Sequence, residues 1–183
     1  AHAGADAHAL LVKPVSLFAP KWQALVQRAT AIDGPRRIVA IGGGAAGVEL
    51  ILAARYRLTA CQTWEQRRED PFTYTLISGT GVLPGHPPRA QRLARAALTE
   101  NGIDVVEHDT AVEIAPHHVR LRSGRQIASD AAIVSTKAKA PAWFANAGLG
   151  RDAAGYLALR STLQTLTDED IFAAGDCATV IEH

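Results

Sequence analysis

A short run of apolar residues, 38–41, is followed directly by three consecutive glycines, 42–44. A mostly apolar segment follows at 48–55. Gly42, Gly44 and Gly47 have the spacing GxGxxG. The apolar run is typical of a parallel strand that is covered on both faces, and the segment after the glycines has the composition of a helix. A strand, a glycine turn and a helix in this order predict a βαβ unit, so the chain is expected to adopt an α/β fold with a parallel sheet.

Each glycine of such a turn has its own task. Gly42 permits the tight turn, Gly44 lets the backbone approach a pyrophosphate, and Gly47 lets the helix pack on the strand. The helix N-terminus adds N–H groups and a partial positive charge that favour phosphates. The motif therefore predicts a dinucleotide site. The alternatives are a turn that binds nothing and an S-adenosylmethionine site, whereas a P-loop is excluded because no Lys-Ser/Thr pair follows the glycines.

The rest of the chain adds the elements of an α/β domain and a segment of different character. Short alternating runs between 111 and 134 predict an antiparallel meander that leads into another buried strand. Elsewhere the pattern predicts a helix after Pro20, strands at 72–77 and 103–107, a helix from Pro87/Pro88 to about 101, a short strand near 156–159, and a helical extension or surface insert at 56–71.

A second motif lies close to the C-terminal end of the sequence. The segment 170–174 (DIFAA) predicts a strand, and Gly175 and Asp176 follow it directly. In that position the carboxylate would stand at the C-terminal edge of a strand, where α/β folds bind ligands. A carboxylate accepts hydrogen bonds only, which suits a ribityl hydroxyl. A strand end with a turn-forming aspartate is the alternative.

Composition excludes several classes of function. Nineteen Lys and Arg against eighteen Asp and Glu leave a net charge of +1, so no basic field attracts nucleic acid or an anionic membrane. Cys61 and Cys177 lack the spacing of a zinc site or a redox disulfide, and we expect a reducing, cytoplasmic location. No apolar run approaches the roughly 18 residues of a membrane span. Scattered histidines predict no metal site, and no nucleophile–base–acid set predicts a catalytic residue.

Taken together, the strings GGGAAGVEL and DIFAAGDCA resemble the FAD-dependent pyridine nucleotide-disulfide oxidoreductases. The similarity spans nearly the whole chain and is strongest to the type-II NADH-dehydrogenase-like branch, in particular to the flavoprotein region that some bacteria carry fused to selenide, water dikinase. The resemblance implies a Rossmann-type three-layer NAD(P)-binding domain with a parallel sheet and an antiparallel β-meander, plus remnants of a split FAD domain. Residues 1–20 would be the tail of the first FAD half, 35–140 the NAD(P)H domain, and 160–183 the start of the second FAD half.

The resemblance also implies cofactors, partners and roles. NAD(P)H would lie on the three glycines of the GxGxxG turn, with Glu49 toward the nicotinamide ribose. Gly175 and Asp176 would contact the ribityl chain of FAD in the full-length protein. Expected partners are these dinucleotides, the remainder of the protein's own FAD domain and a fused kinase module. The location would be the cytoplasm, with the protein either free or at the membrane surface.

Some positions depart from the family pattern. Ser78 stands where the family has an acid for the adenosine ribose, which predicts similar affinities for NADH and NADPH; Thr80 is the other candidate if the register slides. Ser135-Thr136-Lys137 replaces the family's Ala-Thr-Gly, and the first FAD half with its own GxGxxG is expected outside this segment. Two hypotheses remain. One is an enzyme that passes hydride from NAD(P)H through FAD to a quinone-like or selenium-linked acceptor, and the other is a degenerate Rossmann module with a docking or regulatory role.

Overall fold

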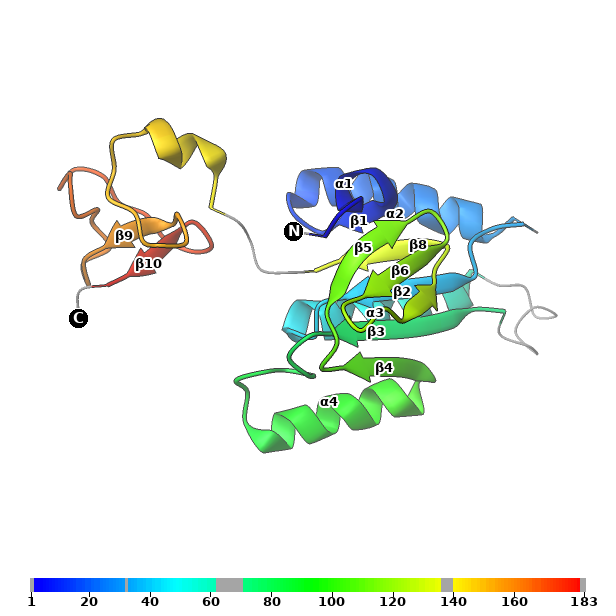
Figure 1. The fold of residues 1–183 in the computed structure, drawn as a ribbon. Coiled ribbons are helices and arrows are strands. Elements are labelled where there is room, and N and C mark those ends of the chain that lie inside the picture. Colours follow the sequence, from blue (N-terminus) through cyan, green and yellow to red (C-terminus); the bar gives the residue numbers. More distant parts are fainter. Residues whose placement is uncertain (1, 32, 62–70, 136–139, 182–183) are drawn as a thin grey trace. The chain divides into compact units, whose positions relative to one another are not determined.

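The computed structural model describes residues 2–31, 33–61, 71–135 and 140–181 of the chain. The fold divides into two compact units, one comprising Ala1–Thr136 and the other Lys137–His183 (Figure 1). Each unit has a hydrophobic core of its own.

A five-stranded parallel sheet forms the centre of the first unit. Its strands, in spatial order, are β1 (Ala9–Leu11), β8 (Ala131–Val134), β2 (Arg37–Ile41), β3 (Thr73–Ser78) and β4 (Ile103–Glu107). From β2 the chain winds outward through β3 to β4, then returns to the opposite side of β2 as β8. The winding reverses between β2 and β8, and ligands of α/β sheets bind at the carboxyl end of the strands at such a point. The glycine turn that follows β2 stands at this place.

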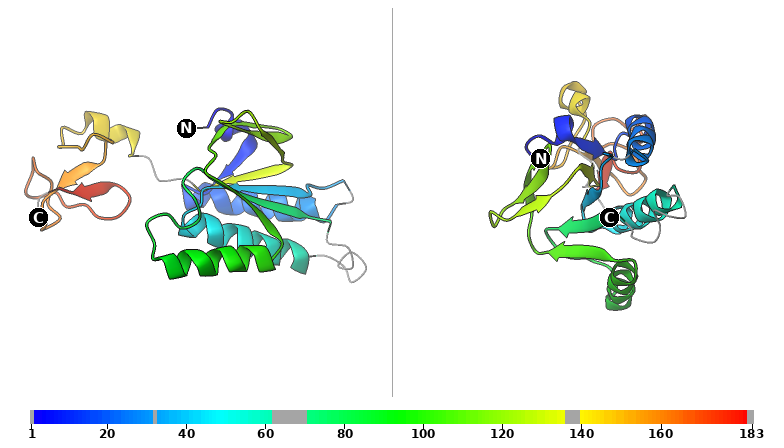
Figure 2. Two further views of the ribbon diagram at one scale, coloured as in Figure 1. Left: turned by 60° about the horizontal axis from the view of Figure 1, so that its bottom comes forward. Right: turned by 90° about the vertical axis from the view of Figure 1, so that its right-hand side faces the viewer.

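In the described part of this unit, three helices cover one face of the sheet: α2 (Val15–Ala29), α3 (Ala45–Ala60) and α4 (Pro88–Glu100) (Figure 2). The other face is covered by an antiparallel sheet of β5 (Ala111–Ala115), β6 (His118–Leu121) and β7 (Gln126–Ala128), beside the short helix α1 (Ala5–His8). Alternate residues of β2 enter the two cores, with Ile38 on the helix side and Val39 on the meander side. The expected three-layer α/β architecture, with its parallel sheet and meander, is confirmed.

The second unit is small. A single turn of 3₁₀ helix, Ala142–Asn146, precedes two parallel strands, β9 (Leu157–Leu159) and β10 (Ala178–Val180). Phe144, Leu157 and Leu159 form its buried apolar cluster. This core supports the turn that carries Gly175 and Asp176.

The prediction of a helix only after Pro20 is wrong, because α2 begins at Val15 and contains the proline. Phe18 packs on the core and stacks on Trp22 with ring centroids 6.3 Å apart. These contacts join the turns before and after the proline. They compensate for the one backbone hydrogen bond that a proline nitrogen cannot donate.

The prediction of a strand at 170–174 is also wrong. Within that segment Phe172 forms only an isolated bridge with Gln164, and its side chain is 62% exposed. A strand requires a neighbour that satisfies its backbone groups in a continuous row. In the described part of this unit β9 pairs with β10, and β10 begins after Asp176. The carboxylate therefore precedes a strand instead of ending one.

Two sequence expectations fall partly outside the described residues. The helical extension is observed as far as Ala60 at the end of α3, whereas residues 62–70 are not described. Thr136 and Lys137, which stand where the family has Thr-Gly, also lie outside the described residues. The assignment of residues 1–20 to an FAD domain stays a prediction about a longer protein. In this structure β1 pairs with β8 and belongs to the first unit.

Candidate functional site

The glycine turn connects the C-terminal end of β2 to the first turn of α3. Gly42 has φ 124°, a conformation that side chains rarely permit, and its N–H donates to the Ile77 carbonyl of β3 at 2.9 Å. Gly44 is the N-cap of α3. Within three residues the chain thus leaves the sheet and enters the helix.

The three glycines of the motif occupy three different surroundings. A Cβ on Gly47 would lie 1.8 Å from the Gly42 carbonyl oxygen, so this glycine is required for the contact between helix and turn. A Cβ on Gly44 would have nothing within 4 Å among the described residues, apart from its own chain neighbours. The fold itself therefore does not require glycine at position 44, and the open space beside this backbone is available to a ligand.

The N-terminus of α3 is suited to an anion. The first N–H groups of a helix have no partner within the helix, and they carry a partial positive charge. Gly44 offers no capping side chain, and the first turn of α3 contains no acidic residue. Ala45 and Ala46 are exposed. A pyrophosphate placed over Gly44 would meet these N–H groups directly, and the residues present fit it.

Beside the glycine turn lies the turn that follows β3. Ser78 at the end of β3 is only 3% exposed, and its hydroxyl donates to the Gly81 carbonyl at 2.7 Å. The Leu83 N–H donates to the Gly43 carbonyl at 2.7 Å, and a Cβ on Gly43 would lie 2.2 Å from the Ser78 Oγ. The two turns are therefore packed tightly together, with Ser78 beneath them.

This geometry gives Ser78 a structural task. Its hydroxyl is buried and already bonded, so it holds the turn in place, and a direct contact with ribose stays a prediction. The neighbouring residues Gly79 and Thr80 are exposed. They are the part of this turn that a ligand can reach.

An ion pair secures the same turn, and the sequence did not single it out. Glu107, at the end of β4, accepts hydrogen bonds from the Val82 N–H at 2.7 Å and from the Nη2 and Nε of Arg95 at 2.7 and 3.1 Å. The bond from Arg95, helped by Val82 and opposed by burial, lowers the pKa of the Glu107 carboxyl below its ordinary value. Ser78 and Glu107 are direct neighbours across β3 and β4.

Arg95 is partly buried and paired with Glu107, whereas Arg89 and Arg92 of the same helix are exposed. One signal was available in the sequence: the predicted strand at 103–107 ends in an acid. The strand pairing was needed to show that this acid stands beside Ser78.

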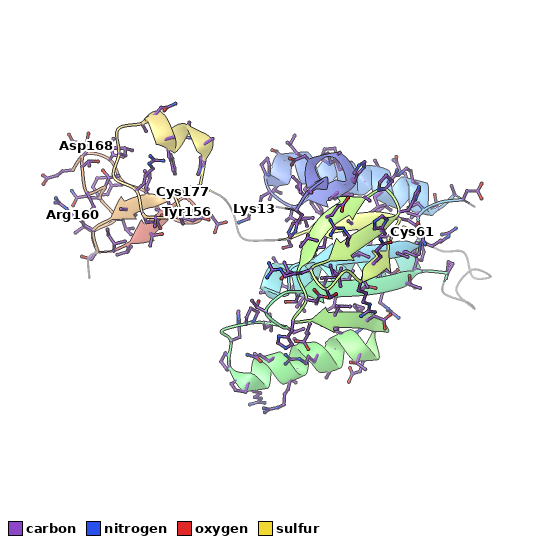
Figure 3. All side chains as sticks on the ribbon, in the orientation of Figure 1. Lys13, Cys61, Tyr156, Arg160, Asp168 and Cys177 are labelled. Carbon is purple, nitrogen blue, oxygen red and sulfur yellow. The ribbon has the colours of Figure 1, made fainter. Side chains whose placement is uncertain are left out.

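The remaining predicted site residues lie apart from this cluster. Glu49 is exposed on α3. Gly175, with φ 78°, and Asp176 form an exposed turn of the second unit. Cys61 at the end of α3 and Cys177 are both free thiols and belong to different units (Figure 3). The binding roles of Glu49, Gly175 and Asp176 remain predictions.

Comparison with known proteins places this arrangement in a family. The sequence pattern of the family described as pyridine nucleotide-disulphide oxidoreductase matches residues 15–183. A type II NADH:quinone oxidoreductase of Haemophilus influenzae is 29% identical over 149 residues, covering 79% of this chain and 34% of that protein. The mitochondrial internal alternative NAD(P)H-ubiquinone oxidoreductase A1 of Arabidopsis thaliana is 23% identical over 146 residues, covering 79% of this chain and 28% of the relative.

Solved structures agree on the fold. NDH2 from Plasmodium falciparum in complex with NADH superposes with a TM-score of 0.77 at 15% identity, over 100% of this chain and 42% of the other. The water-forming NADH oxidase from Lactobacillus brevis, bound to NADH, gives 0.71 at 20% identity, over 97% and 36%.

This chain spans about a third of the length of the curated relatives that it matches. No helix among the described residues is long and apolar enough to cross a membrane. Members of the matched family bind FAD and NAD(P)H. With a family match over residues 15–183, the chain belongs to the pyridine nucleotide-disulphide oxidoreductase family.

Proposed function

We propose that this chain supplies the NAD(P)H-binding unit of an FAD-dependent NAD(P)H oxidoreductase. The observation that carries the proposal is the contrast between two glycines of one turn. The Gly42 carbonyl leaves no room for a side chain on Gly47, as the fold requires, whereas the part of the chain that the structure describes leaves open space where a side chain on Gly44 would stand. A glycine that the fold does not need is explained by a ligand that approaches its backbone.

Different residues of the first unit would contact different parts of the dinucleotide. The N–H groups of Ala45 and Ala46, at the start of α3, would donate to the pyrophosphate, and Gly44 would admit it. The exposed Gly79 and Thr80 would lie beside the adenosine ribose, because the end of the second strand of a βαβ unit takes that position. When bound, the nicotinamide supplies a hydride to the flavin of such an enzyme.

The second unit would meet the flavin. Gly175 and Asp176 are exposed on one turn, and the carboxylate can accept a hydrogen bond from a ribityl hydroxyl. Residues 160–183 would then begin the second half of an FAD domain that the rest of a longer protein completes. These assignments rest on the family match and on the exposed position of the aspartate.

We further propose a quinone-like acceptor, since the relatives from Haemophilus and Arabidopsis are named as quinone and ubiquinone oxidoreductases. The resemblance to the flavoprotein region beside selenide, water dikinase offers a selenium compound as the other acceptor. A longer protein that reduces a soluble quinone but not selenite or a selenium disulfide at the expense of NADH supports the first. The reverse result supports the second.

The primary test is a calorimetric titration of the chain with NADH and with NADPH. We expect binding of both, with affinities within about tenfold of each other, a difference below about 1.4 kcal/mol. Flavin content of the longer protein is the second measurement. A protein that binds neither nucleotide and contains no flavin contradicts the proposal and leaves a Rossmann module with a docking or regulatory role.

A further inference from the structure

Groups of both signs of charge lie beside the turn after β3, the turn at which the ribose is expected. An acid at the end of the second strand selects NADH, because it bonds the ribose 2′-hydroxyl, whereas a nearby arginine accommodates the 2′-phosphate of NADPH. In this chain that strand end is the buried Ser78, which carries no charge. Opposite Ser78 in the sheet stands Glu107 of β4, which is paired with Arg95 of α4, so both groups at this place are ionised.

Both ionised groups reach the turn after β3. From the place that a Cβ on Gly81 would take, the Glu107 Oε1 is 3.1 Å away and the Arg95 Nη2 is 3.8 Å away. The side chains of Arg95 and Glu107 are 39% and 24% exposed, so each keeps a surface toward solvent. Gly79 and Thr80 are the exposed part of this turn.

We infer that the Arg95–Glu107 ion pair determines nucleotide selectivity, by presenting a carboxylate and a guanidinium that cancel each other beside the ribose 2′ position. The inference rests on the proposed NAD(P)H site. A lone carboxylate there would repel a 2′-phosphate, and a lone guanidinium would attract it. Paired, they leave little net field, so neither nucleotide is rejected.

His108 also lies beside this turn, next to Arg95 and Glu107. Its Cε1 lies 3.5 Å from the same Cβ position on Gly81, and its charge contributes to the environment of Glu107. Any measurement of selectivity therefore has to be made at one fixed pH and ionic strength. At fixed pH and ionic strength, substitution of Arg95 or of Glu107 changes the net charge of the pair in opposite directions.

The experiment compares dissociation constants of NADH and NADPH for Arg95→Gln, Glu107→Gln and the double variant, by calorimetry on the whole chain. Arg95→Gln leaves the carboxylate alone and should weaken NADPH relative to NADH by about tenfold. Glu107→Gln keeps an oxygen for the Val82 N–H, leaves the guanidinium alone, and should strengthen NADPH relative to NADH by about the same factor. The double variant should restore the wild-type ratio.

Two controls separate charge from structure. Arg95→Lys keeps the cation and should keep the wild-type ratio, and Arg92→Gln removes an exposed arginine of the same helix and should change nothing. If the single variants weaken both nucleotides equally, the pair is only structural and the inference is overturned. If wild-type chain binds both nucleotides and no variant shifts their ratio, the inference fails while the proposed function stands. Wild-type chain that binds neither nucleotide overturns both.

Discussion

Gly47 approaches Gly42 so closely that a methyl group on its Cα would lie 1.8 Å from the Gly42 carbonyl oxygen. The contact joins the first turn of α3 to the turn that leaves β2. It is a contact between backbones, which no flexible side chain can relieve. Two glycines of one motif are thus fixed by the fold before any ligand binds.

Gly47→Ala should therefore destabilise the fold. The added methyl forces α3 away from β2, and overpacking of this kind costs about 1–3 kcal/mol. Urea unfolding at pH 7 measures the free energy of unfolding. Gly44→Ala is the matched control, because its methyl meets none of the described residues within 4 Å beyond its chain neighbours, and it should cost less than about 1 kcal/mol. Equal losses for the two variants would show that the packing is not as tight as the structure has it.

Gly44→Val should abolish dinucleotide binding without unfolding the chain. The isopropyl group would fill the space that a pyrophosphate needs, whereas its Cβ would meet none of the described residues within 4 Å beyond the chain neighbours. We expect NADH affinity to fall at least about a hundredfold while the urea midpoint changes little. Arg92→Ala, at an exposed position of α4, is the control that should bind as wild type. Undiminished binding to Gly44→Val would mean that this turn binds no nucleotide.

Ser78→Ala should lower stability, because it removes the donor that the Gly81 carbonyl uses in a buried turn. The expected loss is about 1–3 kcal/mol, the cost of a buried polar group without a partner. Ser78→Glu should be more damaging and should not create an NADH-selective site, because the Gly43 backbone leaves no room for it. Thermal unfolding of both variants beside Thr80→Ala, at an exposed position, measures the difference. A folded Ser78→Glu chain that rejects NADPH would restore Ser78 to the role that the sequence suggested.

Acid should weaken the fold through Asp130. This carboxyl accepts hydrogen bonds from the backbone N–H groups of Arg36 and Arg37, at 3.0 and 2.9 Å, and from the Arg37 guanidinium. The bond from the Arg37 side chain, with the two backbone bonds, holds the pKa of Asp130 well below its ordinary value. A carboxyl whose pKa is lower in the folded state stabilises the protein fully above its unfolded pKa of about 3.9. That contribution is lost as the pH falls from about 4 toward the folded pKa.

Asp130→Asn provides the test of this pH dependence. The variant should be less stable than wild type at pH 7, and the difference should shrink as the pH is lowered below about 4. Urea unfolding at pH 7, 5, 3.5 and 2.5 gives both curves. A difference that is constant over this range would assign the stabilisation to hydrogen bonds that do not depend on ionisation.

The order of strand, glycine turn and helix at Ile38–Ile51 was determined by the sequence alone. The apolar run, the glycine spacing and the helical pattern are local signals, and each acts over a few residues. The meander between 111 and 134 was predictable for the same reason, since alternating residues mark strands with one covered face. Helix α4 could likewise be placed from the proline at its start.

What the tertiary structure alone decided concerns contacts between segments far apart in the chain. Phe18 and Trp22 pack on the core on either side of Pro20, and α2 continues through the proline. Local helix propensity alone does not predict this continuation. The segment 170–174 has strand composition but forms no ladder, because strand formation depends on a neighbour and not on composition alone. Ser78 matched a ligand-binding position by sequence, yet its burial beneath Gly43 and its register beside Glu107 became visible only once β3 and β4 were paired. A motif fixes the course of the backbone over a few residues, whereas the surroundings of each side chain depend on which distant residues the fold brings beside it.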